Sequence, residues 1–283
     1  MDWRGRRESS NIEDRRGSGG GMIRPAGVGG IGVLVVVLVG MFFGVDLTPL
    51  LGVGGGPVVT ETAPSGPNAI DDENEQFVAI VLGQTEDVWG QLFKESNLQY
   101  TNPKLVLFTG ATSSACGFAQ SAMGPFYCPN DQTVYLDMDF FRVMEQQLGS
   151  QGEFARAYVI AHEVGHHVQD ELGVLSPVNA QRSRVGERDS NALSVRVELQ
   201  ADCYAGIWAN ASRDAFSLTD DDIRSALDTA ARIGDDALQQ AGQGRVVPDS
   251  FTHGTSEQRQ EWFYRGYRSG DPDQCDTFAA SRN

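Results

Sequence analysis

Hydrophobic residues recur every three or four positions along most of the chain after residue 75, which is the spacing of one face of an α-helix. In residues 76–96, QFVAIVLGQTEDVWGQLFKES, these positions include Val78, Val81, Val88 and Trp89. Two shorter stretches, KLVLFTG and TVYLDM, have instead the composition of short strands. The patterns predict an α+β fold that is mostly helical with a small sheet. Helices are expected at 76–96, 139–149, 151–172, 191–211 and 219–240, and from 255 onward.

Polar residues mark the ends of two of these helices. Ser150 and Glu153 fit the capping box that opens a helix, and so do Thr255 and Gln258. Gly173 follows the helix expected at 151–172, where a left-handed glycine commonly ends a helix. This helix is therefore bounded at both ends by its own sequence.

A stretch without any charged residue, AGVGGIGVLVVVLVGMFFGV, is long enough to cross a bilayer core of about 30 Å. Arginines precede it and an aspartate follows it, so the positive-inside rule places the N-terminus in the cytoplasm. We predict a cytoplasmic tail at 1–25, a transmembrane signal anchor at 26–45, a flexible linker at 46–75 and an exported domain at 76–283. A cleaved signal peptide is the alternative. Glycines four residues apart in the anchor could bring two anchors together in a homodimer.

The chain has 38 acidic and 22 basic residues, and its net charge of −16 argues against binding to nucleic acid, which needs a basic surface. All four cysteines lie in the part predicted to be exported, where disulfides persist. Cys116 and Cys128 flank a short loop and are the natural local pair, which leaves Cys203 for Cys275. Zinc ligation by the cysteines is the alternative, but no C-x-x-C spacing supports it.

Three of the four histidines lie within YVIAHEVGHHVQDELG, residues 158–173. His162 and His166 are four residues apart, so both imidazoles leave one face of a helix and can hold one zinc ion. Glu163 lies at the edge of that face, where it can act as a general base without ligating the metal. His167 is rotated by about 100° from its neighbour and is not expected to reach the same ion.

A catalytic zinc needs a third protein ligand and an open fourth position. The metzincin pattern fails, because Leu172 stands where its third histidine would be. Glu198 and Asp202 are four apart on a second helix, so both carboxylates leave one face. We expect Glu198 to bind the metal and Asp202 to accept the N–H of His162 from behind. His253 is the alternative third ligand. Such an acidic pair alone is usually a solvated helix face, but the histidine pair favours a zinc site.

Several motifs resemble those of a bacterial family of membrane-anchored neutral zinc metallopeptidases of the gluzincin type. The resemblance covers about residues 76–278 and implies a zincin-like fold, Zn²⁺ as cofactor, and a peptide or protein substrate. Similarity to gluzincins also implies that His253 donates to the oxyanion, with Arg259, Tyr264 and Tyr267 as other candidates. It further implies that VYLD supplies an edge strand for an extended substrate. The matching segments are SACG (114–117), GPFYCP (124–129), VYLD (134–137), AHEVGHHVQ (161–169), ELQADCYAG (198–206) and HGTSEQRQEWFYRGY (253–267).

These observations predict a single-pass membrane protein of the bacterial cell envelope that hydrolyses peptide bonds. Zinc held by His162, His166 and Glu198 would activate a water, and Glu163 would accept its proton. One alternative is a catalytically silent zinc-binding scaffold of the envelope, against which the intact Glu163 argues. A third hypothesis is an interaction module whose histidines bind no metal.

Overall fold

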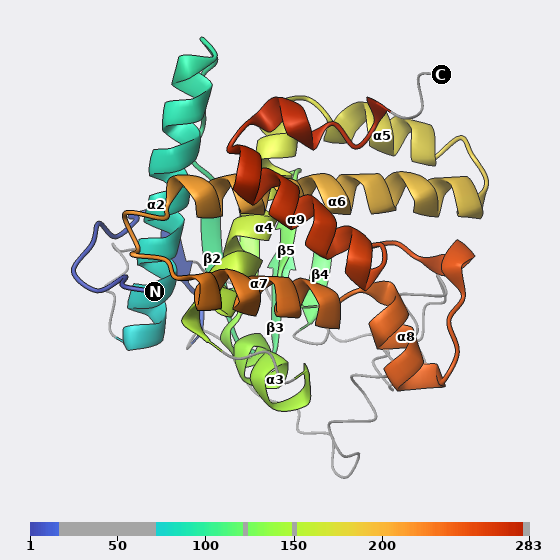
Figure 1. The fold of residues 1–283 in the computed structure, drawn as a ribbon, viewed down its shortest axis with the longest axis horizontal. Helices are drawn as coiled ribbons and strands as arrows, with labels where there is room; N and C mark the ends of the chain where they lie inside the picture. Colours follow the sequence, from blue (N-terminus) through green and yellow to red (C-terminus); the bar gives the residue numbers. More distant parts are fainter. Residues whose placement is uncertain (17–71, 121–123, 149–151, 280–283) are drawn as a thin grey trace.

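The computed structural model describes residues 1–16, 72–120, 124–148 and 152–279. In these residues helices surround a small sheet, as the α+β prediction requires (Figure 1). Each predicted helix has a counterpart, although α2 begins three residues before the expected start at 76. The strands are β1 (Ile12–Asp14), β2 (Lys104–Phe108), β3 (Ala111–Ser114), β4 (Gly117–Gln120), β5 (Phe126–Cys128) and β6 (Thr133–Asp137). The α-helices are α2 (Glu73–Glu95), α3 (Met138–Leu148), α4 (Glu153–Glu171), α5 (Leu175–Arg182), α6 (Glu187–Ala211), α7 (Asp220–Arg232), α8 (Asp235–Gln243) and α9 (Ser256–Ser269), with 3₁₀ turns η3 (Pro248–Ser250) and η4 (Pro272–Cys275).

The main sheet has the order β1-β2-β6-β5, in which β5 alone runs antiparallel to its neighbour. β3 and β4 form a separate antiparallel hairpin. All five residues of β6 are buried, as expected for an interior strand. The VYLD segment belongs to this strand, and the prediction that it forms an edge is wrong for Val134 and Tyr135, which lie between β2 and β5. The register with β5 covers residues 133–135 and does not reach Leu136 or Asp137.

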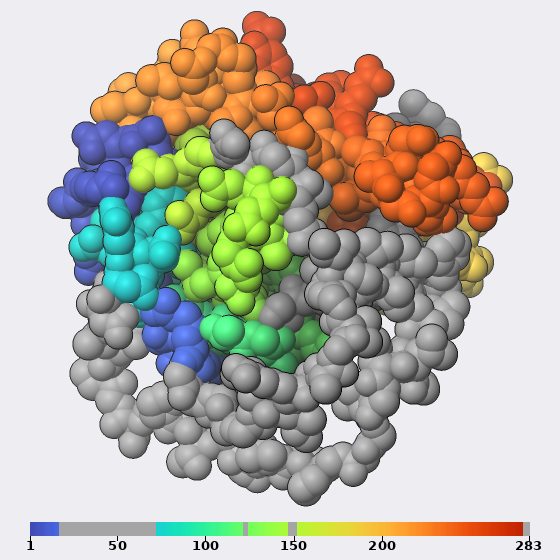
Figure 2. Space-filling model, turned by 90° about the horizontal axis from the view of Figure 1, so that it is seen from below, coloured from blue at the N-terminus to red at the C-terminus, as the bar shows by residue number. Residues whose placement is uncertain are grey.

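Residues 1–16, which we call the N-terminal arm, pack against the rest of the described chain. β1 extends the main sheet by pairing in parallel with β2. Trp3 is 2% exposed and lies edge-on to Phe77 of α2, with ring centroids 5.4 Å apart. Figure 2 shows the arm, in blue, beside α2, in cyan. The prediction of a separate N-terminal tail is therefore wrong for residues 1–16, which complete the sheet and the core.

Charged groups fasten both ends of the arm. The buried α-amino group of Met1 forms an ion pair with Asp222 of α7 at 3.0 Å. At the other end, Arg16 bonds Asp72 at 2.6 Å and Glu75 at 3.1 Å, next to the start of α2. These contacts bring residues 16 and 72 together. The folded unit therefore contains residues from before and from after the segment 17–71.

The helices that carry the histidines and acids approach each other closely at glycines. A Cβ added to Gly165 of α4 would lie 3.0 Å from the carbonyl oxygen of Ala201 of α6. Where α9 crosses α6 (Figure 1), a Cβ on Gly206 or Gly266 would overlap backbone atoms of the facing helix. Glycine at these positions therefore sets the short distances between α4, α6 and α9.

Two details of the predicted helices need correction. The helix expected at 219–240 is divided into α7 and α8 at Gly234, where a Cβ would lie 2.5 Å from the backbone nitrogen of Ser256. The capping box that opens α9 at Thr255 is present. The one expected to open α4 is not, because α4 starts after Gly152, which has a φ of 106° and supplies no side-chain cap. Gly173 ends α4 in the left-handed region, as predicted.

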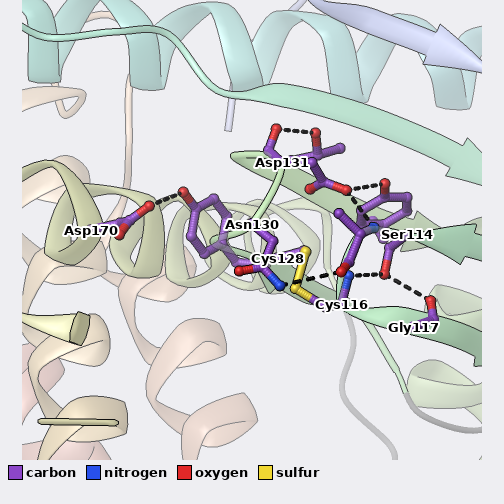
Figure 3. Close-up of a disulfide and its surroundings, with 11 residues drawn as sticks. Ser114, Cys116, Gly117, Cys128, Asn130, Asp131 and Asp170 are labelled. Carbon is purple, nitrogen blue, oxygen red and sulfur yellow. Dashed lines mark hydrogen bonds between the residues drawn. A yellow bond between two sulfur atoms is a disulfide. The ribbon is translucent and has the colours of Figure 1, made fainter. Parts of the chain in front are cut away.

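Both predicted disulfides, Cys116–Cys128 and Cys203–Cys275, are formed, and no cysteine is left as a zinc ligand. Figure 3 shows the first, which ties the turn of the β3–β4 hairpin to β5. Asn130 donates to the carbonyl of Ala115 beside this bond at 3.2 Å. The second disulfide ties η4 to α6, the helix of Glu198 and Asp202.

Within the described residues, no helix is both long and apolar enough to cross a membrane. The anchor predicted at 26–45 and most of the linker predicted at 46–75 lie outside those residues.

Candidate metal centre

Two helices bring the predicted metal ligands together. His162 and His166 leave the same face of α4, and that face meets α6 at the close approach of Gly165 to Ala201. Glu198 lies three residues before this contact on α6, and its carboxylate faces both imidazoles. Its Oε2 is 3.1 Å from Nε2 of His162, and its Oε1 is 3.6 Å from Nε2 of His166. All three donor atoms lie within 4.8 Å of one another.

The donor set fits a zinc ion. Zinc bound to nitrogen and oxygen at about 2.0–2.1 Å in a tetrahedron separates neighbouring ligand atoms by about 3.3 Å. The distances from Glu198 to His162 and His166, 3.1 and 3.6 Å, are close to this value but end on the two different oxygens of Glu198. With one donor atom from each residue, the three atoms lie within 4.8 Å of one another. Two imidazoles and one carboxylate are the protein ligands of many catalytic zinc sites, which keep one position open.

The charges of the metal-free centre also suit a divalent cation. Burial lowers the pKa of His162, but Asp202 and Glu198 outweigh it and raise that pKa to about 10. Glu198 likewise outweighs burial at His166 and raises its pKa. Burial opposes ionisation of Glu198, yet the two histidines hold its pKa well below the usual range. A divalent cation would balance the same negative charges of Glu198 and Asp202 that raise the pKa values of the two histidines.

Each histidine is oriented through its second ring nitrogen. Nδ1 of His162 lies 2.8 Å from Oδ1 of Asp202, as predicted for that residue. Nδ1 of His166 lies 2.8 Å from Oε1 of Gln169, which was not predicted. Gln169 is fully buried and also donates to the carbonyl of Val197 and to Gln200. Its place three residues after His166 on the same helix could have predicted this contact, but a glutamine at that spacing is usually solvated.

Glu163 lies beside the centre without being part of the ligand cluster. Its side chain is buried, and burial raises its pKa, while His162 and His166 act in the opposite direction. Among the described residues its carboxylate has no hydrogen-bond donor that shifts this pKa. A carboxylate with a raised pKa next to a metal site has the properties of a general base that works near neutral pH.

His253 is placed at the edge of the centre by a buried carboxylate. Asp235, the first residue of α8, accepts from the backbone nitrogens of Thr252, His253 and Gly254 at 2.7, 2.7 and 3.1 Å. Its other oxygen lies 3.1 Å from Nδ1 of His253. The charges of His253 and Glu198 shift each other's pKa, so the two side chains lie within electrostatic range of each other. Asp235 was not predicted, because its partner turn is formed by residues 17 to 19 positions away.

The other residues considered from the sequence lie elsewhere. Arg259 is buried behind the centre, where it bonds Asp202, so it is not exposed to a substrate. Tyr264 is 44% exposed, and its ring lies by that of Tyr267 on α9. His167 points away from the metal cluster, to the hydroxyl of Tyr127 and the carbonyl of Thr101, as its rotation on the helix predicted.

Comparison with known proteins places the whole described fold in one family. The chain is 50% identical over 288 residues to "Uncharacterized protein YpfJ" of Escherichia coli (strain K12), a match that covers 99% of this chain and 100% of that one. It is 45% identical over 218 residues to "Uncharacterized protein Rv2575" of Mycobacterium tuberculosis (strain ATCC 25618 / H37Rv), covering 73% and 71% of the two chains. No solved structure matches the chain. The family model described as "Putative neutral zinc metallopeptidase" matches residues 1–278, so that the N-terminal arm is included. The chain therefore belongs to this metallopeptidase family.

Proposed function

We propose that the protein is a zinc-dependent metallopeptidase that hydrolyses peptide bonds. The observation that carries this proposal is the convergence of His162, His166 and Glu198, with donor atoms within 4.8 Å of one another, beside a buried Glu163. A purely structural zinc site has four protein ligands and no use for a neighbouring base. Three donors and a carboxylate with a raised pKa instead support hydrolysis.

In this mechanism, bound zinc supplies Lewis-acid chemistry, which polarises a carbonyl and makes a water more acidic. A carboxylate oxygen of Glu163 accepts the proton of the attacking water and later delivers it to the leaving amine. His253 donates from Nε2 to the oxyanion that develops on the substrate; this requires the protonated ring, which Asp235 favours by accepting from Nδ1. Asp202 and Gln169 hold the ligand histidines at Nδ1, so that each Nε2 faces the metal.

An extended peptide can dock on β5 in place of β6, the strand that the sequence predicted to pair with a substrate. β5 is the outermost strand of the main sheet on the side that contacts α4. Edge strands present unpaired backbone groups and bind extended peptides by strand addition. The Cys116–Cys128 disulfide fixes this strand at its last residue.

Location and assembly are further parts of the proposal. We infer that the domain works in the cell envelope, where its two disulfides would persist. Attachment to a membrane through residues 26–45, and a homodimer formed there, rest on the sequence alone. The pairing of β1 with β2 requires an attachment that leaves both strands on one side of the membrane.

The test compares the full-length wild type with Glu163→Gln, both loaded with zinc, on a broad peptide library and on envelope proteins. The wild type should cleave, and the variant should be slower by about 10²–10⁴-fold, since it keeps the ligands but lacks the base. Equal zinc content in the two proteins is the control. Equal cleavage by both would remove Glu163 as the base, and absence of cleavage by the wild type would favour the silent zinc-binding scaffold.

A further inference from the structure

Asp202 is a fully buried carboxylate with four hydrogen bonds, and two of them come from one arginine. Its Oδ1 accepts from the hydroxyl of Tyr158 at 2.6 Å and from Nδ1 of His162 at 2.8 Å. Arg259 donates from Nη2 to the same oxygen at 3.0 Å and from Nε to Oδ2 at 2.8 Å. Both oxygens of Asp202 are thus held by the planar fork of one guanidinium, which is the strongest geometry for such a pair.

Arg259 itself is 3% exposed, so its charge is removed from water. A buried arginine is costly unless it is paired and its remaining donors are satisfied. Here Nη1 also donates to the carbonyl of Ile233, at 3.3 Å. The close crossing of α6 and α9 at Gly206 and Gly266 brings the arginine within reach of Asp202.

We propose that Arg259 is a positioning residue for the metal ligand His162, acting through Asp202. The fork prevents rotation of the carboxylate, so one oxygen stays directed at Nδ1 of His162, and the ring presents Nε2 to Glu198. The positive charge of Arg259 also balances the negative charge that Asp202 brings into the core. The inference rests on the proposed zinc site, since orientation of His162 matters most when its Nε2 ligates a metal.

A different explanation is that Arg259 only fastens α9 to α6. If Arg259 acts on the metal ligand through Asp202, its loss should weaken zinc binding by protein that is still folded, and only while residue 202 is an aspartate. If it only fastens the helices, which it also does through Asp202, its loss should lower the free energy of unfolding and leave the zinc affinity of the folded protein unchanged. A double-mutant cycle in zinc affinity, with the free energy of unfolding of each protein measured beside it, separates the two explanations.

The experiment uses the full chain and four proteins: wild type, Arg259→Gln, Asp202→Asn and the double variant. Zinc affinity is measured by competition with a chromogenic chelator, which does not depend on cleavage. We expect Arg259→Gln to weaken zinc binding by about 10–100-fold in the wild-type background, as for other groups that orient a metal ligand. In the Asp202→Asn background the further loss should be below about threefold. Equal losses in both backgrounds would overturn the proposal.

Arg259→Lys provides a second, milder variant should the glutamine protein fail to fold. Lysine keeps the charge but cannot form the two-pronged bond, so zinc binding should fall to an intermediate value. Unchanged affinity in this variant would contradict a role for the fork. Gln260→Ala is the matched control, because Gln260 is the next residue of α9 and bonds only the carbonyl of Leu227 among the contacts described. It should keep the wild-type zinc affinity.

The outcomes separate this inference from the proposed function. Loss of cleavage in Glu163→Gln together with an additive cycle would leave the peptidase in place and reject Arg259 as a positioning residue. A wild type that binds no zinc would reject both.

Discussion

Trp3→Ala tests whether the N-terminal arm is part of the folded domain. Trp3 is 2% exposed, and replacing a buried tryptophan by alanine costs about 3–5 kcal/mol. The indole Nε1 has no hydrogen-bond partner among the described residues. Because an unsatisfied buried donor itself costs about 1–3 kcal/mol, the loss should fall at the lower end, about 3 kcal/mol.

The assay is urea unfolding of the full-length protein, from which the free energy of unfolding of each variant is obtained. Glu8→Ala is the control, since Glu8 is exposed and forms one hydrogen bond, from Gln76. Its effect should stay within about 0.5 kcal/mol, as for most surface substitutions. If Trp3→Ala changed stability as little as this control, the arm would not be part of the core.

The arm also constrains the parts of the chain before and after residues 26–45 relative to a membrane. β1 and β2 share backbone hydrogen bonds, so they must be on the same side of any membrane. A single crossing by residues 26–45 would place them on opposite sides. Cysteines introduced one at a time at exposed Glu8 and Glu95 should therefore react alike with a membrane-impermeant maleimide in intact cells. Opposite labelling of the two positions would contradict the packing of the arm.

Four further predictions concern the metal centre. Zinc affinity should rise with pH, because zinc must displace the proton of His162, whose pKa is raised to about 10 in the metal-free protein. The stability from this protonated histidine is fully present below about pH 6.5 and is lost as the pH rises through 10, so metal-free protein should unfold more easily at high pH in urea titrations. Gly165→Ala should cost about 1–3 kcal/mol and weaken zinc binding, since the added methyl group meets Ala201; equal affinity would show that α4 and α6 can separate at no cost. His253→Gln should lower kcat by about 10²–10³-fold at full zinc occupancy, and an unchanged kcat would remove His253 as the oxyanion donor.

The metal centre could be predicted because its parts follow helical spacing. His162 and His166, like Glu198 and Asp202, are four residues apart, so each pair shares a helix face whatever the rest of the fold does. The contact between the two helices is a tertiary feature. It was predicted only because both pairs of metal-binding residue types lie on apolar helices. Arg259 was predicted only as a candidate contact to the substrate, because no feature of the neighbouring sequence shows that its side chain faces the core.

The arm and the strand order could not be predicted for a different reason. β1 contains one buried residue, Ile12, between polar neighbours, so it lacks the apolar alternation of a strand. It pairs with β2 across a long sequence separation, and the position of β6 inside the sheet depends on β5. The break at Gly234 is likewise imposed by Ser256 of another helix, while the local sequence continues the helical pattern.

The most direct test of the central claim is the zinc content of the purified protein and of Glu198→Ala. His162, His166 and Glu198 together should hold one zinc per chain, and the variant should lose it, since two imidazoles alone bind weakly. Glu187→Ala, an exposed carboxylate in the first turn of the same helix, should keep full occupancy. Full occupancy in Glu198→Ala would contradict the account, because the ion would then be held by other groups.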